Sequence, residues 1–168
     1  MIIYAARKYV SPRARPLTPE EQQTRRISYA LKDWTAPDYA RALETAAREI
    51  AAMTEGPCTL IPVPDRKGGR QANRLLAKRI AAHVDGARVV DCLRRTRPVE
   101  SSCERHKARR GALPIADHHL ERDPSKWLDM VRTYFVDNTT TSGNTLRAAR
   151  AALGFGDALV FSDASPNR

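Results

Sequence analysis

The sequence predicts an α/β protein with a doubly wound, mostly parallel sheet. The chain has 168 residues, and 42% of them are apolar, which is enough for one compact domain with its own core. From residue 58 onward, short apolar runs alternate with amphipathic helical segments, the order typical of parallel strands joined by crossover helices. We therefore expect a single domain over residues 1–168, with small N-terminal helices in residues 1–55 and an α/β core in residues 56–168.

The N-terminal part is predicted to form one short strand and two helices. Residues 2–5 are apolar and suit a strand, and three prolines mark residues 11–19 as a loop. Thr18 is an expected N-cap, because a proline and two acids follow it. The apolar face of this helix would consist of Ile27, Ala30, Leu31 and Trp34. A second helix begins near residues 35–38 and ends at Gly56.

The remainder alternates between the two kinds of element. Strands are expected at residues 58–64, 87–93, 130–137 and 158–161. Helices are expected at residues 71–84 and 143–153. Residues 65–70 form a basic loop that contains glycines. Residues 94–110 are densely basic without apolar periodicity, which predicts an exposed loop.

Charge and cysteine content narrow the partners and the compartment. The 29 Lys and Arg against 19 Asp and Glu give a net charge of +10, which favours phosphates, pyrophosphates or nucleic acid as partners. Three widely spaced cysteines suit a reducing cytosol better than a disulfide framework. The opening apolar run is too short for a signal peptide, and no stretch is long enough to span a bilayer. We expect a cytoplasmic protein without a membrane partner.

Residues 134–146, YFVDNTTTSGNTL, predict a strand, a loop and a helix that hold a phosphate. A strand is expected to end at Asp137, where a carboxylate can accept hydrogen bonds from ribose hydroxyls. Hydroxyls and the free N–H groups of a helix start suit a phosphate dianion, and Gly143 lets the backbone approach it. The phosphate-binding residues would be Thr139, Thr140, Thr141, Ser142, Gly143, Asn144 and Thr145. The alternative is a hydroxyl-rich N-cap without a ligand; the segment is neither a Walker A loop nor a GxGxxG turn.

This segment resembles the PRPP-binding loop of type I phosphoribosyltransferases. In that family the loop runs as apolar residues, two acids, a short linker, Thr-Gly and Thr. Asp137 matches the first acid, Ser142-Gly143 stands for Thr-Gly, and Thr145 matches the closing Thr. Asn138 stands where the family has its second acid. An amide can hydrogen-bond but cannot supply charge or take a proton. Asn138 is therefore compatible with ligand binding, whereas catalysis has to be tested separately.

Further segments are similar to the competence protein ComF branch of this family. LIPVPDRKGGR at residues 60–70 resembles its PVP segment and basic loop, and ISYALKDW at residues 27–34 resembles its N-terminal helix. LRRTRP at residues 93–98 and the stretch at residues 105–113 resemble two later motifs, although an expected Gln and an expected Asn are missing. The ordered matches span roughly residues 24–163.

The resemblance implies a phosphoribosyltransferase that uses PRPP and Mg²⁺, with the N-terminal helices as a small hood. It would transfer the phosphoribosyl group to or from a nitrogenous base, and pyrophosphate would leave. Catalytic roles fall on Asp137, Asn138, Arg95 and Arg105, and pyrophosphate binding on Arg66, Lys67 and Gly68. Asp137 would be the protein ligand of Mg²⁺, which otherwise takes oxygens of PRPP. This fold often forms homodimers, so a homodimer is a further expectation.

Other functions stay open at this stage. The amide at the second acid position and the +10 charge also suit a non-catalytic PRPP- or nucleotide-sensing protein, or one associated with DNA uptake. Residues 94–110 could instead contact nucleic acid or form a solvated loop. The run Asp117-His118-His119 suggests a metal site, but no second ligand cluster has suitable spacing. Cys103 is a candidate reactive thiol, and Trp127 is expected to pack in the interior.

Overall fold

The structure is a computed structural model of the chain, and it describes residues 1–12, 15–69, 71–101, 104–105, 108–128 and 132–165. The strands of the main sheet are β1 (Ile3–Lys8), β2 (Cys58–Pro62), β3 (Arg88–Val89), β6 (Arg132–Thr140) and β7 (Asp157–Asp163). They lie in the order β1-β7-β6-β2-β3, and every neighbouring pair is parallel. This confirms the predicted α/β architecture with a mostly parallel sheet.

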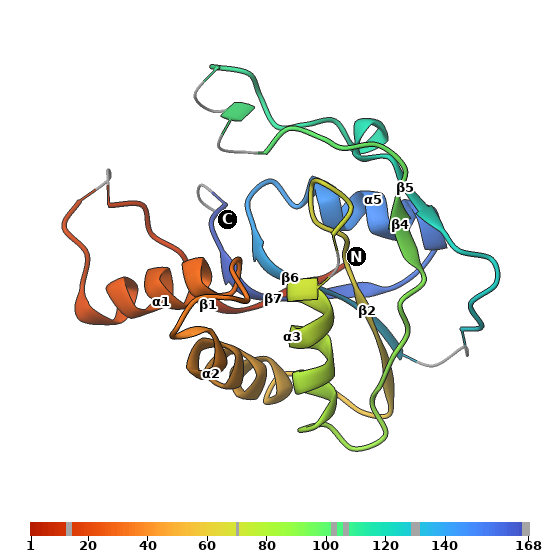
Figure 1. Cartoon of the computed structure of the whole chain (residues 1–168), viewed down its shortest axis with the longest axis horizontal. Helices are drawn as coiled ribbons and strands as arrows, with labels where there is room; N and C mark the ends of the chain where they lie inside the picture. The colour runs from red at the N-terminus through yellow and green to blue at the C-terminus, as the bar shows by residue number, and fades with distance from the viewer. Residues whose placement is uncertain (13–14, 70, 102–103, 106–107, 129–131, 166–168) are drawn as a thin grey trace.

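Helices cover both faces of this sheet (Figure 1). The helices are α1 (Pro19–Ala30), α2 (Tyr39–Ala51), α3 (Gln71–Ala81) and α5 (Asn144–Leu153). One buried cluster joins α1, α2 and α3 to Tyr134, Val136 and Phe161 of the sheet. A second cluster joins α5 to Phe135 and Val160. Successive residues of β6 and β7 thus serve opposite cores, because side chains alternate between the faces of a strand.

The N-terminal helices begin as their sequences predict. The Thr18 hydroxyl accepts from the Glu21 N–H at 3.3 Å, and the Glu21 carboxylate accepts from the Thr18 N–H at 2.9 Å, which completes a capping box. Ile27 is buried as expected, but Trp34 is 56% exposed. The placement of Trp34 on the apolar face was wrong because α1 ends at Ala30, so its periodicity does not extend to this residue.

The predicted strand at residues 87–93 is two separate strands. After β3 the chain turns at Cys92, whose N–H donates to the Val90 carbonyl at 3.1 Å. The strand β4 (Leu93–Arg95) then pairs antiparallel with β5 (Leu120–Arg122) in a second, two-stranded sheet. A 3₁₀ turn, η1 (Ile115–His118), precedes β5. The interpretation of residues 94–110 as loop was therefore wrong at its start, where the partner strand lies 25 or more residues away.

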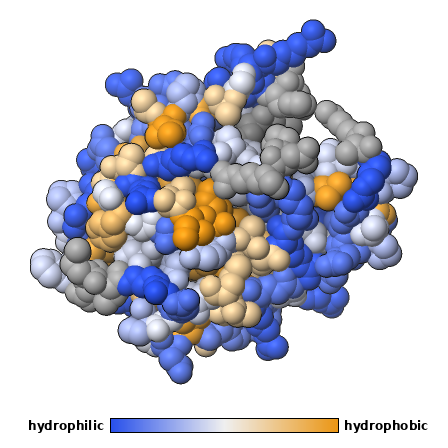
Figure 2. All heavy atoms as spheres, turned by 180° about the vertical axis from the view of Figure 1, so that it is seen from behind, coloured by the Kyte–Doolittle hydropathy of each residue, from blue (hydrophilic) through white to orange (hydrophobic). Residues whose placement is uncertain are grey.

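The surface is largely polar. Seen from behind, hydrophilic residues predominate, and the apolar residues form small groups (Figure 2). Trp127 is 79% exposed, which contradicts its expected place in the interior. Within the described ranges, no helix has both the length and the apolar character needed to cross a membrane. Cys58 and Cys92 are buried free thiols, and burial raises the pKa of Cys92 to about 11; Cys103 lies outside the described residues.

Candidate functional site

A cleft of about 440 Å³ opens beyond the carboxyl ends of β2 and β6. In parallel α/β sheets, ligands bind at this edge. Three segments that are distant in sequence meet there: the loop after β2, the end of β6 with the following loop, and β4 with residues 99–101 and 105. The predicted site residues that line it are Arg66, Lys67, Arg95, Arg105, Asp137, Asn138, Thr139, Thr140, Thr141, Ser142, Gly143 and Thr145. Gly68 and Asn144 are not among its lining residues.

Strand β6 does not end at Asp137, as its sequence predicted, but continues to Thr140. The neighbouring strand β7 extends equally far, and the register pairs Thr139 with Ser162 and Thr140 with Asp163. Threonine is β-branched and suits a strand. The loop between strand and helix is therefore only residues 141–143, and two of the expected loop threonines are strand residues.

The helix after this loop begins at a glycine in the left-handed backbone conformation, which glycine adopts readily. Gly143 is the N-cap of α5 with φ +77°, and no side chain caps the helix there. The Ser142 hydroxyl accepts from the Asn144 N–H at 3.2 Å. The Asn144 amide donates to the Leu113 carbonyl at 2.8 Å, so this side chain joins the helix start to the segment before η1. The first-turn N–H groups of α5 lie beside the cleft and give it a positive end.

Asp137 is the carboxylate of β6 that lines the cleft. Its Oδ1 accepts from the Asn73 amide at 3.0 Å and from the Asn138 N–H at 2.8 Å. Burial raises the pKa of the Asp137 carboxyl to about 6; these two hydrogen bonds, and then the charges of Lys32 and Arg95, oppose the rise. Protein surrounds the carboxyl on most sides, although the residue keeps a partly exposed edge toward the cleft. A carboxylate held this way is suited to accept hydrogen bonds from ligand hydroxyls.

The loop after β2 is folded around Asp65. Its Oδ1 accepts from the N–H groups of Lys67 and Gly69, both at 2.8 Å, and its carbonyl accepts from the Gly68 N–H at 3.0 Å. The Gly68 N–H, which was expected to bind pyrophosphate, and the Gly69 N–H are therefore not available to a ligand, because an Asx-type turn occupies them. In this loop, the charged side chains of Arg66 and Lys67 are the groups that can face an anion. Arg70, the last residue of the predicted loop, lies outside the described residues.

Arg95 forms hydrogen bonds with two segments that line the cleft. Its guanidinium donates to the Asp65 carbonyl at 2.7 Å, to the Pro64 carbonyl at 3.3 Å and to the His118 carbonyl. Burial lowers the pKa of Arg95, and Asp137 and Asp65 oppose that effect. Because these bonds use several of its five donors, the main role of Arg95 is structural: it links the loop after β2 to η1.

The second predicted arginine is held by its own segment. Arg105 donates to the Gly111 carbonyl at 2.8 Å and to the Glu100 carboxylate at 3.3 Å, and its side chain is 17% exposed. Arg66 pairs with Glu104 at 2.9 Å, and the Val99 N–H donates to the Arg66 carbonyl at 2.9 Å. These contacts tether the basic segment beside the loop after β2. Lys107 of that segment lies outside the described residues.

The cleft contains residues that sequence patterns did not assign to a site. Lys32 follows α1 and contributes positive charge next to Asp137. Asn73 is 6% exposed and donates to the Val63 carbonyl at 2.8 Å as well as to Asp137. A lone amide on the inner face of a predicted helix was the signal available for Asn73. No local pattern marked Lys32, which lies beside Asp33 in the segment ISYALKDW.

His118, which the sequence suggested only as part of a metal site, also lines the cleft. It is 6% exposed, and neither ring nitrogen makes a hydrogen bond of normal geometry to a described residue. Burial and the Arg95 charge lower the pKa of His118, while the Leu113 backbone and Asp117 oppose this. The imidazole is therefore neutral near pH 7.

The side chains of the cleft offer few ligands for a metal ion. In the described part of the chain, no group of three or more His, Cys, Asp or Glu residues gathers, so the Asp117-His118-His119 run forms no such cluster. The Asp137 carboxylate at the cleft is an oxygen ligand of the kind that Mg²⁺ takes. This donor set suits an ion held mainly by ligand phosphates, with Asp137 as its protein ligand.

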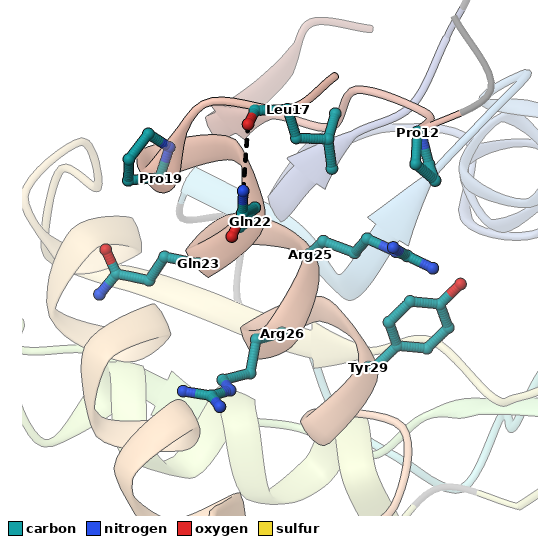
Figure 3. Close-up of a pocket in the computed structure, with 8 residues that line it drawn as sticks. All are labelled: Pro12, Leu17, Pro19, Gln22, Gln23, Arg25, Arg26 and Tyr29. Atoms are coloured by element: carbon teal, nitrogen blue, oxygen red, sulfur yellow. Dashed lines mark hydrogen bonds between the residues drawn. The ribbon is translucent and has the colours of Figure 1, made fainter. Parts of the chain in front are cut away.

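A second cavity, of about 730 Å³, lies along α1 and the segment before it (Figure 3). Its lining residues are Pro12, Leu17, Pro19, Gln22, Gln23, Arg25, Arg26 and Tyr29. Figure 3 shows Arg25 and Tyr29 on one side of the helix and Gln23 and Arg26 on the other. The polar groups do not converge on one point, and no carboxylate lines the cavity. The larger cavity is therefore the weaker candidate for a site.

No protein-family model matches the chain, and no curated protein matches it in sequence. The functional argument consequently depends on the residues and geometry of the cleft.

Proposed function

We propose that this protein is a phosphoribosyltransferase that acts on PRPP and Mg²⁺. One observation carries the proposal: a single cleft brings together the largely enclosed carboxylate of Asp137 on β6, a hydroxyl-rich loop before a helix, and cations from two other segments. The three parts correspond to the three parts of PRPP, which are a ribose, a 5′-phosphate and a pyrophosphate. The transfer would join a nitrogenous base to the ribose, or release one, with pyrophosphate as the leaving group.

Each part would act by position and charge. Residues 141–145 would hold the 5′-phosphate through hydroxyls and the positive end of α5. Asp137 would orient the ribose and stabilise positive charge that develops on it in the transition state. Lys67, Arg66 and Arg105 would neutralise the pyrophosphate as it leaves. Mg²⁺, when bound with PRPP, would offset part of the phosphate charge, with Asp137 as its protein ligand.

The first experiment measures binding and turnover separately. Isothermal titration with PRPP and Mg²⁺ should show binding, and a coupled assay should detect pyrophosphate release with one of a panel of purine and pyrimidine bases. Asp137→Asn should weaken PRPP binding, because a neutral amide replaces the ribose-binding charge. Unchanged PRPP affinity in this variant would remove Asp137 from the site.

The second candidate function is a sensor of PRPP or nucleotides, as would suit a role in DNA uptake. Asn138 favours it, because it replaces an acid with a group that cannot take a proton. The inward N–H groups of the loop after β2 favour it as well, because they leave the pyrophosphate fewer donors. PRPP binding without turnover, together with transferase activity in Asn138→Asp, would support the sensor over the enzyme.

A further inference from the structure

A chain of three hydroxyl groups runs from the cleft into the interior. Thr139 Oγ1, at the cleft, lies 3.0 Å from Ser162 Oγ on the neighbouring strand. Ser162 Oγ lies 2.9 Å from Ser28 Oγ on α1, and Ser28 Oγ donates to the Thr24 carbonyl at 2.8 Å. Ser162 is fully buried and Ser28 is 2% exposed. The inner links of this chain are therefore closed to solvent.

The carbonyl at the inner end sets the direction of every bond in the chain. A carbonyl can only accept, and each hydroxyl has a single proton. Ser28 gives its proton to the Thr24 carbonyl, so Ser162 must donate to Ser28. Ser162 then has no proton left, and Thr139 must donate to Ser162. The opposite direction would place two lone pairs against each other at 2.8 Å in a dry site, which is costly.

The hydroxyl of Ser142, three residues further along the chain, differs from that of Thr139 because its proton is available to a ligand. Its hydroxyl accepts from the Asn144 N–H at 3.2 Å, so its own proton is not used in that bond. The Ser142 hydroxyl can therefore donate to an anion, whereas the Thr139 hydroxyl keeps only lone pairs for a ligand. Both residues line the cleft.

We propose that Thr139 is a specificity-determining residue that meets the ligand only as a hydrogen-bond acceptor. The ligand group opposite Thr139 must then carry an O–H or N–H, and it is not a phosphate oxygen. Asp137 bonds to Asn73 on α3, and Thr139 is linked through Ser162 to Ser28 on α1, so both side chains turn toward the helices α1 and α3 and offer acceptors on that side of the cleft. The identity of the donor rests on the proposed function, under which it is a ribose hydroxyl. Under this proposal Thr139 does not bind the phosphate, although the sequence assigned it to the phosphate-binding residues.

The test compares two probes on matched variants by isothermal titration: inorganic phosphate and ribose 5-phosphate. Thr139→Val should weaken ribose 5-phosphate binding by roughly 3- to 10-fold, the loss of one neutral hydrogen bond, and leave phosphate binding unchanged. Thr139→Ser, which keeps the hydroxyl, should bind both as the native chain does. Ser142→Ala should weaken both probes. Equal weakening of both probes by Thr139→Val would overturn the proposal, because it would show that Thr139 donates to phosphate.

The direction of the hydroxyl chain can also be measured without a ligand. In a neutron structure, the Thr139 proton should lie between Thr139 Oγ1 and Ser162 Oγ. A Ser162 proton directed at Thr139 would overturn the proposal even if ribose 5-phosphate binds. If neither probe binds the native chain while the proton lies as expected, the proposed function fails and the acceptor role of Thr139 stands. Ser162→Ala should release the Thr139 proton and leave phosphate affinity equal to or above that of the native chain.

Discussion

Replacing Asp137 with asparagine should stabilise the fold above pH 6 while weakening the ligand site. Burial raises the pKa of this carboxyl to about 6 from an ordinary 3.8. The folded state therefore binds the proton more tightly than the unfolded chain does. Because the unfolded state binds fewer protons between these values, ionised Asp137 lowers the stability of the fold as pH rises. Asparagine has nearly the same shape, and its Oδ1 can still accept from Asn73 and Asn138.

The size of the effect follows from the two pKa values. One pH unit corresponds to about 1.4 kcal/mol, so the full displacement would cost the ionised form at most about 3 kcal/mol. The partly exposed edge of Asp137 admits solvent screening, so we expect a gain of roughly 1–3 kcal/mol for Asp137→Asn. The gain should grow between about pH 4 and pH 6 and stay constant above about pH 7.

Urea unfolding of both chains at pH 4, 5, 6, 7 and 8 measures this difference directly. Asp33→Asn is the matched control, because Asp33 is exposed and hydrogen bonds from the Thr35 hydroxyl and backbone lower its pKa. Its ionised form favours folding, so Asp33→Asn should give no stabilisation as pH rises. If Asp137→Asn is no more stable than the native chain at pH 8, or if the difference does not shrink toward pH 4, burial does not raise the pKa of this carboxyl as described.

Four further variants test the contacts that hold the site in place and the core of the protein. Gly143→Ala should lower stability by about 1 kcal/mol or more and weaken phosphate binding, because its φ of +77° is left-handed; urea unfolding and titration check both. Arg95→Lys should reduce the free energy of unfolding by roughly 1–3 kcal/mol, since one ammonium cannot reach three carbonyls. Amide hydrogen exchange around residues 64–66 should become faster, because the loop after β2 loses these contacts. Unchanged exchange would contradict the structural role of Arg95. Phe161→Ala should cost about 3–5 kcal/mol, whereas Trp127→Ala, at a 79% exposed position, should cost under about 1 kcal/mol; comparable losses would contradict the assigned core.

The sequence by itself determined the elements whose signals are local. The Thr18 cap, the buried face of α2 and the helix that starts after Gly143 depend on residues a few positions apart, so their patterns predict them directly. The alternation of these elements also determined the parallel sheet. The resemblance assigned Asp137 and residues 66–68 to one site, and Asp137, Arg66 and Lys67 line one cleft, because strand ends of a parallel sheet meet at one edge.

Only the tertiary structure decided the features that depend on a distant partner. The β4–β5 pair and the continuation of β6 to Thr140 exist because a neighbouring strand offers the matching backbone groups, and no local pattern encodes that register. The roles of Asn73 and Lys32 likewise depend on the fold bringing them to the carboxylate of Asp137. A carbonyl on α1, three hydrogen bonds away, determines whether the Thr139 hydroxyl donates to a ligand or accepts from it. A threonine in this sequence motif can therefore bind either a hydrogen-bond donor or an acceptor, depending on the residues that contact it from the interior.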